Sequence, residues 1–192
     1  QYLPEEDWPR SWADLADPKY EGKIIMANPS LSGSAYAQLA QMLQLYDWDV
    51  VEGLVRNATF VSSSQLVFEN VARGEIEIGI TGEANIAMLL AEGWPVAAIY
   101  PSEGTGLRFD AMGIIAGGPN PESARVFMDW ATSLANHEIA ARHFRRSVRA
   151  DAPAPEGLAP TAEIPTFPYD PDLAAATRDE NLRRFDELFS AR

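Results

Sequence analysis

Residues 23–101 alternate between short apolar segments and segments in which apolar residues recur at helical spacing. Strands are expected at 23–27, 59–61, 75–81 and 95–101. Helices are expected at 35–45, 48–55, 65–73 and 84–92. Because parallel strands need crossover connections and helices supply them, this alternation predicts an α/β layer structure with a largely parallel sheet.

The second half of the chain has a different pattern. One strand is expected at 111–117, and helices are expected at 121–135, 137–146 and 179–189. A Pro-rich stretch before the last helix is expected to be extended or loop-like. With only one clear strand, residues 102–192 are not expected to form an independent α/β domain.

The composition limits the class of partner. The 192 residues carry a net charge of -13, from 28 acidic and 15 basic residues, which disfavours nucleic acid and an anionic membrane surface as partners. The absence of cysteine excludes disulfides and thiolate metal sites. No apolar run approaches the ~20 residues of a membrane span. No signal peptide is visible and the first residue is Gln1, so we expect a processed or truncated chain.

Three polar loops follow predicted strands and precede predicted helices, at 28–34, 62–65 and 81–83. Ligands of open α/β sheets bind outside the carboxyl ends of the strands, where such loops gather. The helix N-termini there expose unpaired N–H groups and the positive end of the helix dipole. These loops therefore indicate a place where a small anion could bind.

Serine and glycine residues fill the first two of these loops. A single serine at such a position is best explained as a helix N-cap. Two serine clusters in equivalent strand-to-helix positions favour a ligand site, although no lysine follows the glycine as in a phosphate-binding P-loop. The candidates are Ser32, Gly33, Ser34, Ser62, Ser63 and Ser64.

The third loop and the segment after the next strand add further candidates. Glu83 either stabilises the start of a helix through the helix dipole or presents a carboxylate to ligand hydroxyl groups, an ammonium or a metal. Asn85 is equally ambiguous. The segment 99–106, which contains Tyr100 and Glu103, is either an ordinary loop or a crossover between lobes whose residues face a cleft.

Catalytic patterns are sparse. His137 and His143 lie on an Arg-rich helical segment and are expected at the surface. The sequence has neither a G-x-S-x-G nucleophile turn nor an H-E-x-x-H motif, and no spaced metal-ligand cluster. We therefore predict a protein that is not an enzyme, with no catalytic residue, no metal site and no cofactor.

Several segments carry a family resemblance. PRSWADLADPKYEGKIIMANPSLSGSAY resembles the start of the second lobe in type II periplasmic solute-binding proteins of ABC importers. It is most similar to the branch that holds ferric-iron, phosphorylated-sugar and aminoethylphosphonate binders. Those proteins carry P-x-S-W-x-D-L-x-x-P-x-Y-x-G-K-I and then N-P-x-x-S-G-[ST]-A. VARGEIEIGITGEANIAMLLAEGWPVAAIYPSEGTG, PNPESARVFMDWATS and RRSVRADAPAPEGL resemble later segments of the family, in the same order.

The resemblance implies a type II periplasmic-binding-protein-like fold. Residues 1–98 would form one complete α/β lobe, the second lobe. Residues 99–192 would form the hinge return and the C-terminal part of the first lobe. The rest of the first lobe is expected from a missing N-terminal segment, either in a longer chain or as a companion chain.

The resemblance also implies a function. Two lobes would trap a small-molecule solute in a cleft, and a membrane permease would recognise the closed form, in a periplasmic or otherwise extracytoplasmic location. By position, the loops at 32–34 and 62–64 match cleft loops of the family, and Glu83 matches a cleft residue. Ferric-binding relatives carry a Tyr-Tyr pair where this chain has residues 82–85, GEAN. A phosphorylated sugar or phosphonate is therefore favoured. Ferric iron, to which Tyr100 could contribute, and a periplasmic sensory domain of the same fold are the alternatives.

Overall fold

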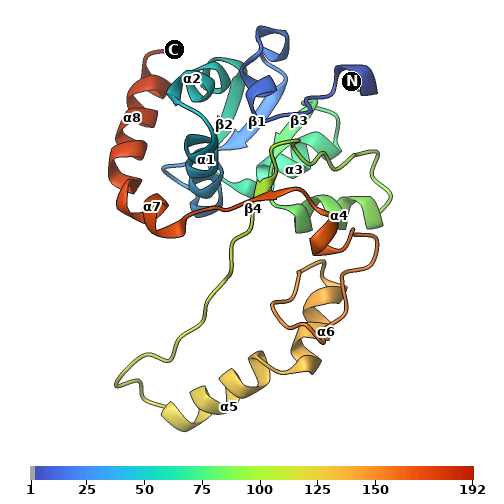
Figure 1. Cartoon of the computed structure of the whole chain (residues 1–192), viewed down its shortest axis with the longest axis vertical. Helices are drawn as coiled ribbons and strands as arrows, with labels where there is room; N and C mark the ends of the chain where they lie inside the picture. Colours follow the sequence, from blue (N-terminus) through green and yellow to red (C-terminus); the bar gives the residue numbers. More distant parts are fainter. Residues whose placement is uncertain (1–2) are drawn as a thin grey trace. The chain divides into compact units, whose positions relative to one another are not determined.

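The structure is a computed structural model of the chain, which describes residues 3–192 (Figure 1). The contacts divide the chain into two compact units. Unit 1 comprises the residues up to Leu107 together with Ile164–Arg192, and unit 2 is Arg108–Glu163.

Unit 1 is built on a three-stranded parallel sheet with the order β2-β1-β3. Its strands are β1 (Ile24–Ala27), β2 (Ala58–Val61) and β3 (Ile78–Ile80). Ala27 pairs with Val61 and Met26 with Ile80, so the three carboxyl ends lie at one edge. The expected α/β architecture with a parallel sheet is confirmed. β3 is shorter than predicted, because its pairing with β1 begins at Ile78 opposite Ile24.

Helices cover both faces of this sheet. The connection from β1 to β2 and that from β2 to β3 run in opposite directions across the sheet, so right-handed crossovers place their helices on opposite faces (Figure 1). The first connection holds α1 (Gly33–Leu45) and α2 (Trp48–Asn57), and the second holds α3 (Ser64–Ala72). α4 (Glu83–Ala91) follows β3. These helices match the predicted ones to within about two residues.

Three short 3-10 helices precede the sheet: Glu5–Asp7, Ala13–Ala16 and Pro18–Tyr20. The second of them packs against α2 so closely that a Cβ on Gly53 would lie 2.4 Å from the Cβ of Ala16. Asn57, at the end of α2, is buried and donates from Nδ2 to the carbonyl oxygens of Leu15 and Asp17. The N-terminal segment is therefore an integral part of unit 1.

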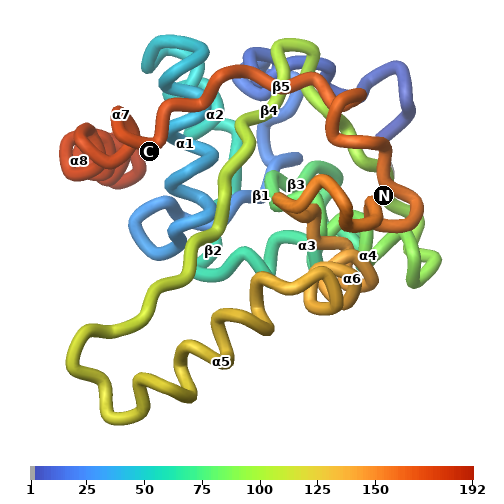
Figure 2. Tube along the Cα trace, turned by 60° about the horizontal axis from the view of Figure 1, so that its bottom comes forward, coloured from blue at the N-terminus to red at the C-terminus, as the bar shows by residue number. Residues whose placement is uncertain are grey.

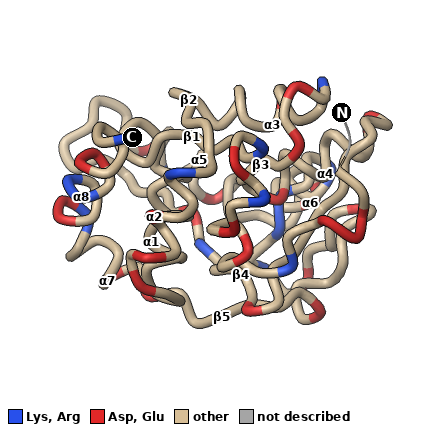
Figure 3. The backbone as a smooth tube through the Cα atoms, turned by 90° about the horizontal axis from the view of Figure 1, so that it is seen from above, with Lys and Arg blue, Asp and Glu red and all other residues tan. Residues whose placement is uncertain are grey.

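The C-terminal helices α7 (Pro171–Ala176) and α8 (Arg178–Ser190) also belong to unit 1. Phe185 of α8 is buried in the same core as Ile24, and its ring lies 5.1 Å from that of Phe60 on β2. α8 carries both basic and acidic residues along its length (Figure 3), and these residues are exposed. The prediction grouped residues 164–192 with the other lobe, and the contacts group them with unit 1. Helical periodicity shows that a helix has a buried face, but it does not identify the element against which that face packs.

Unit 2 consists of α5 (Pro121–Ala131), α6 (Leu134–Arg142), the 3-10 helix Thr161–Glu163 and long irregular segments. The predicted helix 121–135 ends earlier because Ser133 caps α6, its Oγ accepting from the N–H of Asn136 at 3.3 Å. The buried hydrophobic residues in the described part of unit 2 are two alanines, Ala131 and Ala141. Large side chains lie in solvent instead, including Phe109 and Ile115, which are 75% and 82% exposed.

Two predicted strands are not formed. Residues 95–101 in unit 1 and 111–117 in unit 2 are apolar but have irregular backbone. A strand needs a neighbour to pair with its N–H and C=O groups, and neither segment pairs with another described strand. Instead, a short pair forms between β4 (Thr105–Gly106) and β5 (Thr166–Phe167), both within unit 1 (Figure 2).

Candidate functional site

Three serine hydroxyl groups meet at the carboxyl edge of the sheet. Ser32 Oγ lies 3.0 Å from Ser34 Oγ and 3.1 Å from Ser64 Oγ, and the last two are 2.8 Å apart. We call these residues the serine triangle. Ser32 and Ser34 belong to the start of α1, and Ser64 is the first residue of α3. Two loops that are 30 residues apart in the chain therefore form one cluster.

The topology brings the triangle together. β1 and β2 are parallel neighbours, so the loops that follow them emerge side by side, and each leads directly into a helix. The positive ends of the α1 and α3 dipoles and their unpaired N–H groups lie at this edge. A Cβ added to Gly33 would meet no atom within 4 Å, so the backbone there is open to approach. The arrangement suits oxygen atoms of a small anion.

The loop that carries Ser32 is held from two sides. Asn28 Oδ1 accepts from the N–H of Ser30 at 2.8 Å, and the Asn28 N–H donates to the carbonyl of Val61 at 2.7 Å. Ser30 Oγ donates to Asp186 Oδ1 of α8 at 2.8 Å. Asp186 is thus a supporting residue that the sequence did not indicate, since it lies 156 residues further along the chain.

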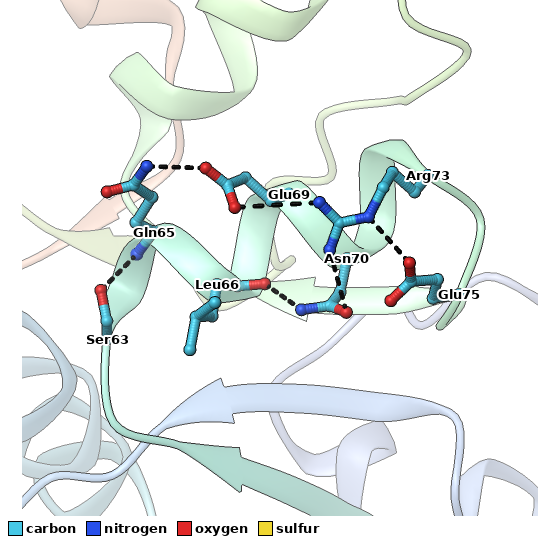
Figure 4. Close-up of polar contacts among 7 residues, drawn as sticks. All are labelled: Ser63, Gln65, Leu66, Glu69, Asn70, Arg73 and Glu75. Carbon is cyan, nitrogen blue, oxygen red and sulfur yellow. Dashed lines mark hydrogen bonds and ion pairs between the residues drawn. The ribbon is translucent and has the colours of Figure 1, made fainter.

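The other two serine candidates have different surroundings. Ser63 is the N-cap of α3, and its Oγ accepts from the N–H of Gln65 at 3.1 Å (Figure 4). Ser62 is exposed, and its hydroxyl makes no hydrogen bond to any other described residue. The structure therefore brings together Ser32, Gly33, Ser34 and Ser64, and leaves Ser62 and Ser63 beside them.

Glu83 and Tyr100 form a pair at the third strand end. Glu83 is the first residue of α4, after β3, and its Oε1 accepts a hydrogen bond from the hydroxyl of Tyr100. Asn85 donates from Nδ2 to Thr81 Oγ1 at 2.9 Å, within the same strand-to-helix turn. A carboxylate paired with a phenol can accept from hydroxyl or ammonium groups of a ligand. Both residues were predicted from the sequence as site candidates, but the contact between them was not.

Glu103 is bound by residues from the N-terminal segment and the end of α1. Its Oε1 accepts from the N–H of Trp12 at 3.0 Å and from the hydroxyl of Tyr46. Nearby, the side chain of Gln41 accepts from the N–H of Gly106 at 2.9 Å. The segment 99–106 was considered either a loop or a cleft-facing crossover, and from Glu103 onward it is bound to unit 1. Trp12, Gln41 and Tyr46 were not named from the sequence.

Residues 3–192 contain neither a cluster of metal ligands nor a membrane-spanning helix. No group of three or more His, Cys, Asp or Glu residues in this range could hold a metal ion. No helix in the same range is both long and apolar enough to cross a membrane. His143 is exposed, and His137 contacts the hydroxyl of Ser147 at 2.8 Å.

Comparisons with known proteins identify the family of this chain. A family model described as bacterial extracellular solute-binding protein matches residues 1–170. An uncharacterized protein of Haemophilus influenzae is 34% identical over 137 residues, which is 69% of this chain and 40% of the relative. The family and the solved relatives are binding proteins rather than enzymes.

Two solved structures illustrate the similarity. The periplasmic binding protein AfuA from Actinobacillus pleuropneumoniae, with exogenous fructose-6-phosphate bound, has a TM-score of 0.88 and 26% identity, over 97% of this chain and 61% of that chain. Iron-bound HitA from Pseudomonas aeruginosa has a TM-score of 0.81 and 20% identity, over 95% of this chain and 63% of that chain, and shows the fold alone.

The chain thus spans less than two thirds of the length of these relatives. The match of the family model over residues 1–170, together with the similarity to AfuA, confirms the resemblance to type II periplasmic solute-binding proteins. This chain belongs to the bacterial extracellular solute-binding protein family.

Proposed function

We propose that this chain is part of the solute receptor of an ABC importer, which traps a small anionic organic solute, such as a phosphorylated sugar or a phosphonate, between two lobes. The serine triangle carries this proposal. Its three hydroxyl groups lie 2.8 to 3.1 Å apart and each can rotate to donate to a different oxygen of one phosphate. The helix N-termini of α1 and α3 add N–H donors and a favourable potential.

The neutral character of these donors fits the chain as a whole. With a net charge of -13, the protein repels anions at long range, so an anion must be held by local donors. The Glu83–Tyr100 pair would then accept from hydroxyl or amine groups on the rest of the solute. The bound fructose-6-phosphate of AfuA has both kinds of group, a phosphate and sugar hydroxyls, and this similarity supports the proposal.

The proposed setting follows from the family. A receptor of this kind works outside the cytoplasm, in the periplasm or an equivalent compartment, and its closed form is recognised by a membrane permease. Ferric iron is the alternative solute. The absence of the expected Tyr-Tyr pair after β3 and the mutual hydrogen bond of Glu83 and Tyr100 favour an organic anion.

The exposed apolar side chains of unit 2 bear on the rest of the protein. We propose that a further segment, in a longer chain or as a companion chain, covers Phe109, Ile115 and the apolar side of α5. Exposed patches of this kind mark surfaces that other protein covers. The greater length of the relatives leaves room for such a segment.

Isothermal titration of the complete protein tests the solute class. The panel holds fructose 6-phosphate, aminoethylphosphonate, unphosphorylated fructose and ferric citrate. Binding of a phosphorylated or phosphonate compound is expected, and Ser34→Ala and Ser64→Ala should each weaken it about fivefold to tenfold, the value of one hydrogen bond. Ser133→Ala, at the N-cap of α6, is the matched control, since it also removes a serine hydroxyl at the start of a helix but leaves the serine triangle unchanged.

Two results would overturn the proposal. Heat of binding with ferric citrate alone would assign the protein to iron. Unchanged affinity of both serine variants for a phosphorylated ligand would remove the triangle from the site.

A further inference from the structure

The two chain connections between the units join unit 1 next to a single pair of short strands, β4 and β5. The chain leaves unit 1 after Leu107 and returns at Ile164. β4 lies immediately before the exit and β5 shortly after the return, and the two pair in parallel (Figure 2). If the proposed two-lobed function holds, any movement between lobes must be accommodated by the backbone next to this pair.

The pair is too closely packed to bend internally. Gly104 has a φ of 96°, and a Cβ there would lie 2.7 Å from the carbonyl carbon of Thr166. A Cβ on Gly106 would lie 3.0 Å from the Cβ of Tyr169. The exit segment and the return segment are therefore in direct contact, and glycine permits the approach.

Glu103 binds the exit segment to the rest of unit 1. Its carboxylate accepts from the N–H of Trp12 and from the hydroxyl of Tyr46, at the end of α1. The indole N–H of Trp12 donates in turn to the carbonyl of Gly104 at 3.1 Å. Burial and the bond to Glu103 raise the pKa of Tyr46 to about 12, so the phenol remains a donor at neutral pH.

Gln41 makes a second connection from α1. It is 6% exposed, its Oε1 accepts from the N–H of Gly106, and its Nε2 has no hydrogen-bond partner among the described residues. The hydroxyl of Thr105 also donates to this oxygen, at 3.5 Å, so contacts with β4 fix the direction of the buried amide. Because α1 begins at the serine triangle, one helix contacts both the candidate ligand site and β4.

We propose that Glu103 is a positioning residue for lobe closure: together with Trp12, Tyr46 and Gln41 it fixes residues 102–106 to unit 1, so that the chain bends beyond Gly106. Closure would then move the other lobe about a defined point, and the serine triangle in unit 1 would keep its place relative to that point. This role rests on the proposed receptor function, but the anchoring itself is measurable without any ligand.

Two measurements on the complete protein test the anchor. The first is amide hydrogen exchange at residues 102–106. The second is the distance between spin labels at Glu21→Cys in unit 1 and Glu138→Cys in unit 2, which is possible because the chain has no native cysteine. For Glu103→Ala we expect about tenfold faster exchange at 102–106 and a broader distance distribution. Glu103→Gln, which still accepts hydrogen bonds, should restore both.

Asn57→Ala controls for general destabilisation, because it removes two buried hydrogen bonds of unit 1 that involve no residue of β4. It should leave the exchange at 102–106 and the distances as in the wild type. Wild-type exchange and distances in Glu103→Ala would overturn the proposal, as would the same changes in Asn57→Ala. A failure to find any ligand would count against the receptor function only, since both readouts use the ligand-free protein.

Discussion

Unit 1 and unit 2 differ in how they separate apolar from polar side chains. In unit 1, α3 packs its inner face on the sheet, and its outer face carries a polar ladder (Figure 4). Gln65 donates to Glu69, and Arg73 pairs with both Glu69 and Glu75. In unit 2, α5 exposes Val126, Phe127 and Trp130 to solvent. α5 of unit 2 thus exposes large apolar side chains to solvent, whereas α3 of unit 1 packs its apolar face on the sheet.

Helix formation and the completeness of a hydrophobic core are therefore separate properties. α5 has a proline at its first turn and a regular amphipathic pattern, so it forms locally. Its apolar face is nevertheless uncovered in the described chain. Most of the stabilisation of a protein helix comes from the packing of such a face, so unit 2 should be much less stable than unit 1.

The largest expected contrast is between two phenylalanines. Phe185 is 1% exposed and Phe127 is 54% exposed. Phe185→Ala should lower the free energy of unfolding by about 3–5 kcal/mol, because it leaves a cavity in the core of unit 1. Phe127→Ala should change it by less than about 1 kcal/mol. Urea denaturation of this chain measures both. Equal losses would show that unit 2 has a core of its own.

A smaller contrast concerns two glycines. A Cβ on Gly53 would overlap Ala16, including its backbone Cα at 2.9 Å, whereas a Cβ on Gly113 of unit 2 would meet no atom within 4 Å. Gly53→Ala should therefore cost about 1–3 kcal/mol through overpacking. Gly113→Ala should be nearly neutral. Thermal melts of the two variants compare them, and a tolerated Gly53→Ala would contradict the close packing of α2 on the N-terminal segment.

The dependence of stability on pH should also differ between the two units. Burial alone would raise the pKa of Glu103, but hydrogen bonds led by that from Tyr46 lower it below its usual value of 4.5. The stability contributed by Glu103 is therefore fully present above pH 4.5 and is lost as the pH falls through the lowered value. The pKa of Tyr46 is raised from 10.0 to about 12. The stability that Tyr46 contributes is therefore fully present below pH 10 and is lost as the pH rises through about 12.

Denaturation profiles of two variants measure these effects. Glu103→Gln should flatten the acid limb of the stability profile. Asp151→Asn in unit 2 is the matched control, since the pKa of Asp151 is also lowered, by Arg149, but this pair is at the surface and is screened by salt. If Asp151→Asn flattened the acid limb and Glu103→Gln did not, the assignment of the acid-sensitive stability to Glu103 would be wrong.

The smallest expected effect is on the outer face of α3. Arg73→Ala removes ion pairs of 3.8 Å to Glu69 and 2.8 Å to Glu75, all with exposed side chains. Such pairs contribute about 0–1 kcal/mol, so the variant should be close to wild type and the difference should shrink in salt. A loss as large as that of Phe185→Ala would mean that this face has a structural role.

Local patterns predicted most of unit 1. The strand at 24–27 and the helices that follow the three strands were recognised from apolar spacing and turn residues. The meeting of Ser32, Ser34 and Ser64 followed from the rule that parallel strand ends gather loops at one edge. These features depend on residues that are near in sequence, or on the topology of the parallel sheet, which allows few arrangements when the strands are few.

The features that the sequence did not show depend on distant contacts. Residues 95–101 and 111–117 have strand composition, but a strand exists only when a neighbour pairs with it. Phe185 joins a core built around residue 24, and Glu103 binds Tyr46 57 residues earlier in the chain. No local pattern specifies the partner in such cases, so neither the packing of α8 on the core of unit 1 nor the Glu103 anchor was predicted.

A crystal structure of the complete protein with fructose 6-phosphate would test the proposed site most directly. The expected result is a phosphate whose oxygens lie within hydrogen-bond distance of the hydroxyl groups of Ser32, Ser34 and Ser64, with sugar hydroxyls directed toward Glu83 and Tyr100. A phosphate bound elsewhere, or a ferric ion held by tyrosine side chains in the cleft, would contradict the serine triangle as the anion site.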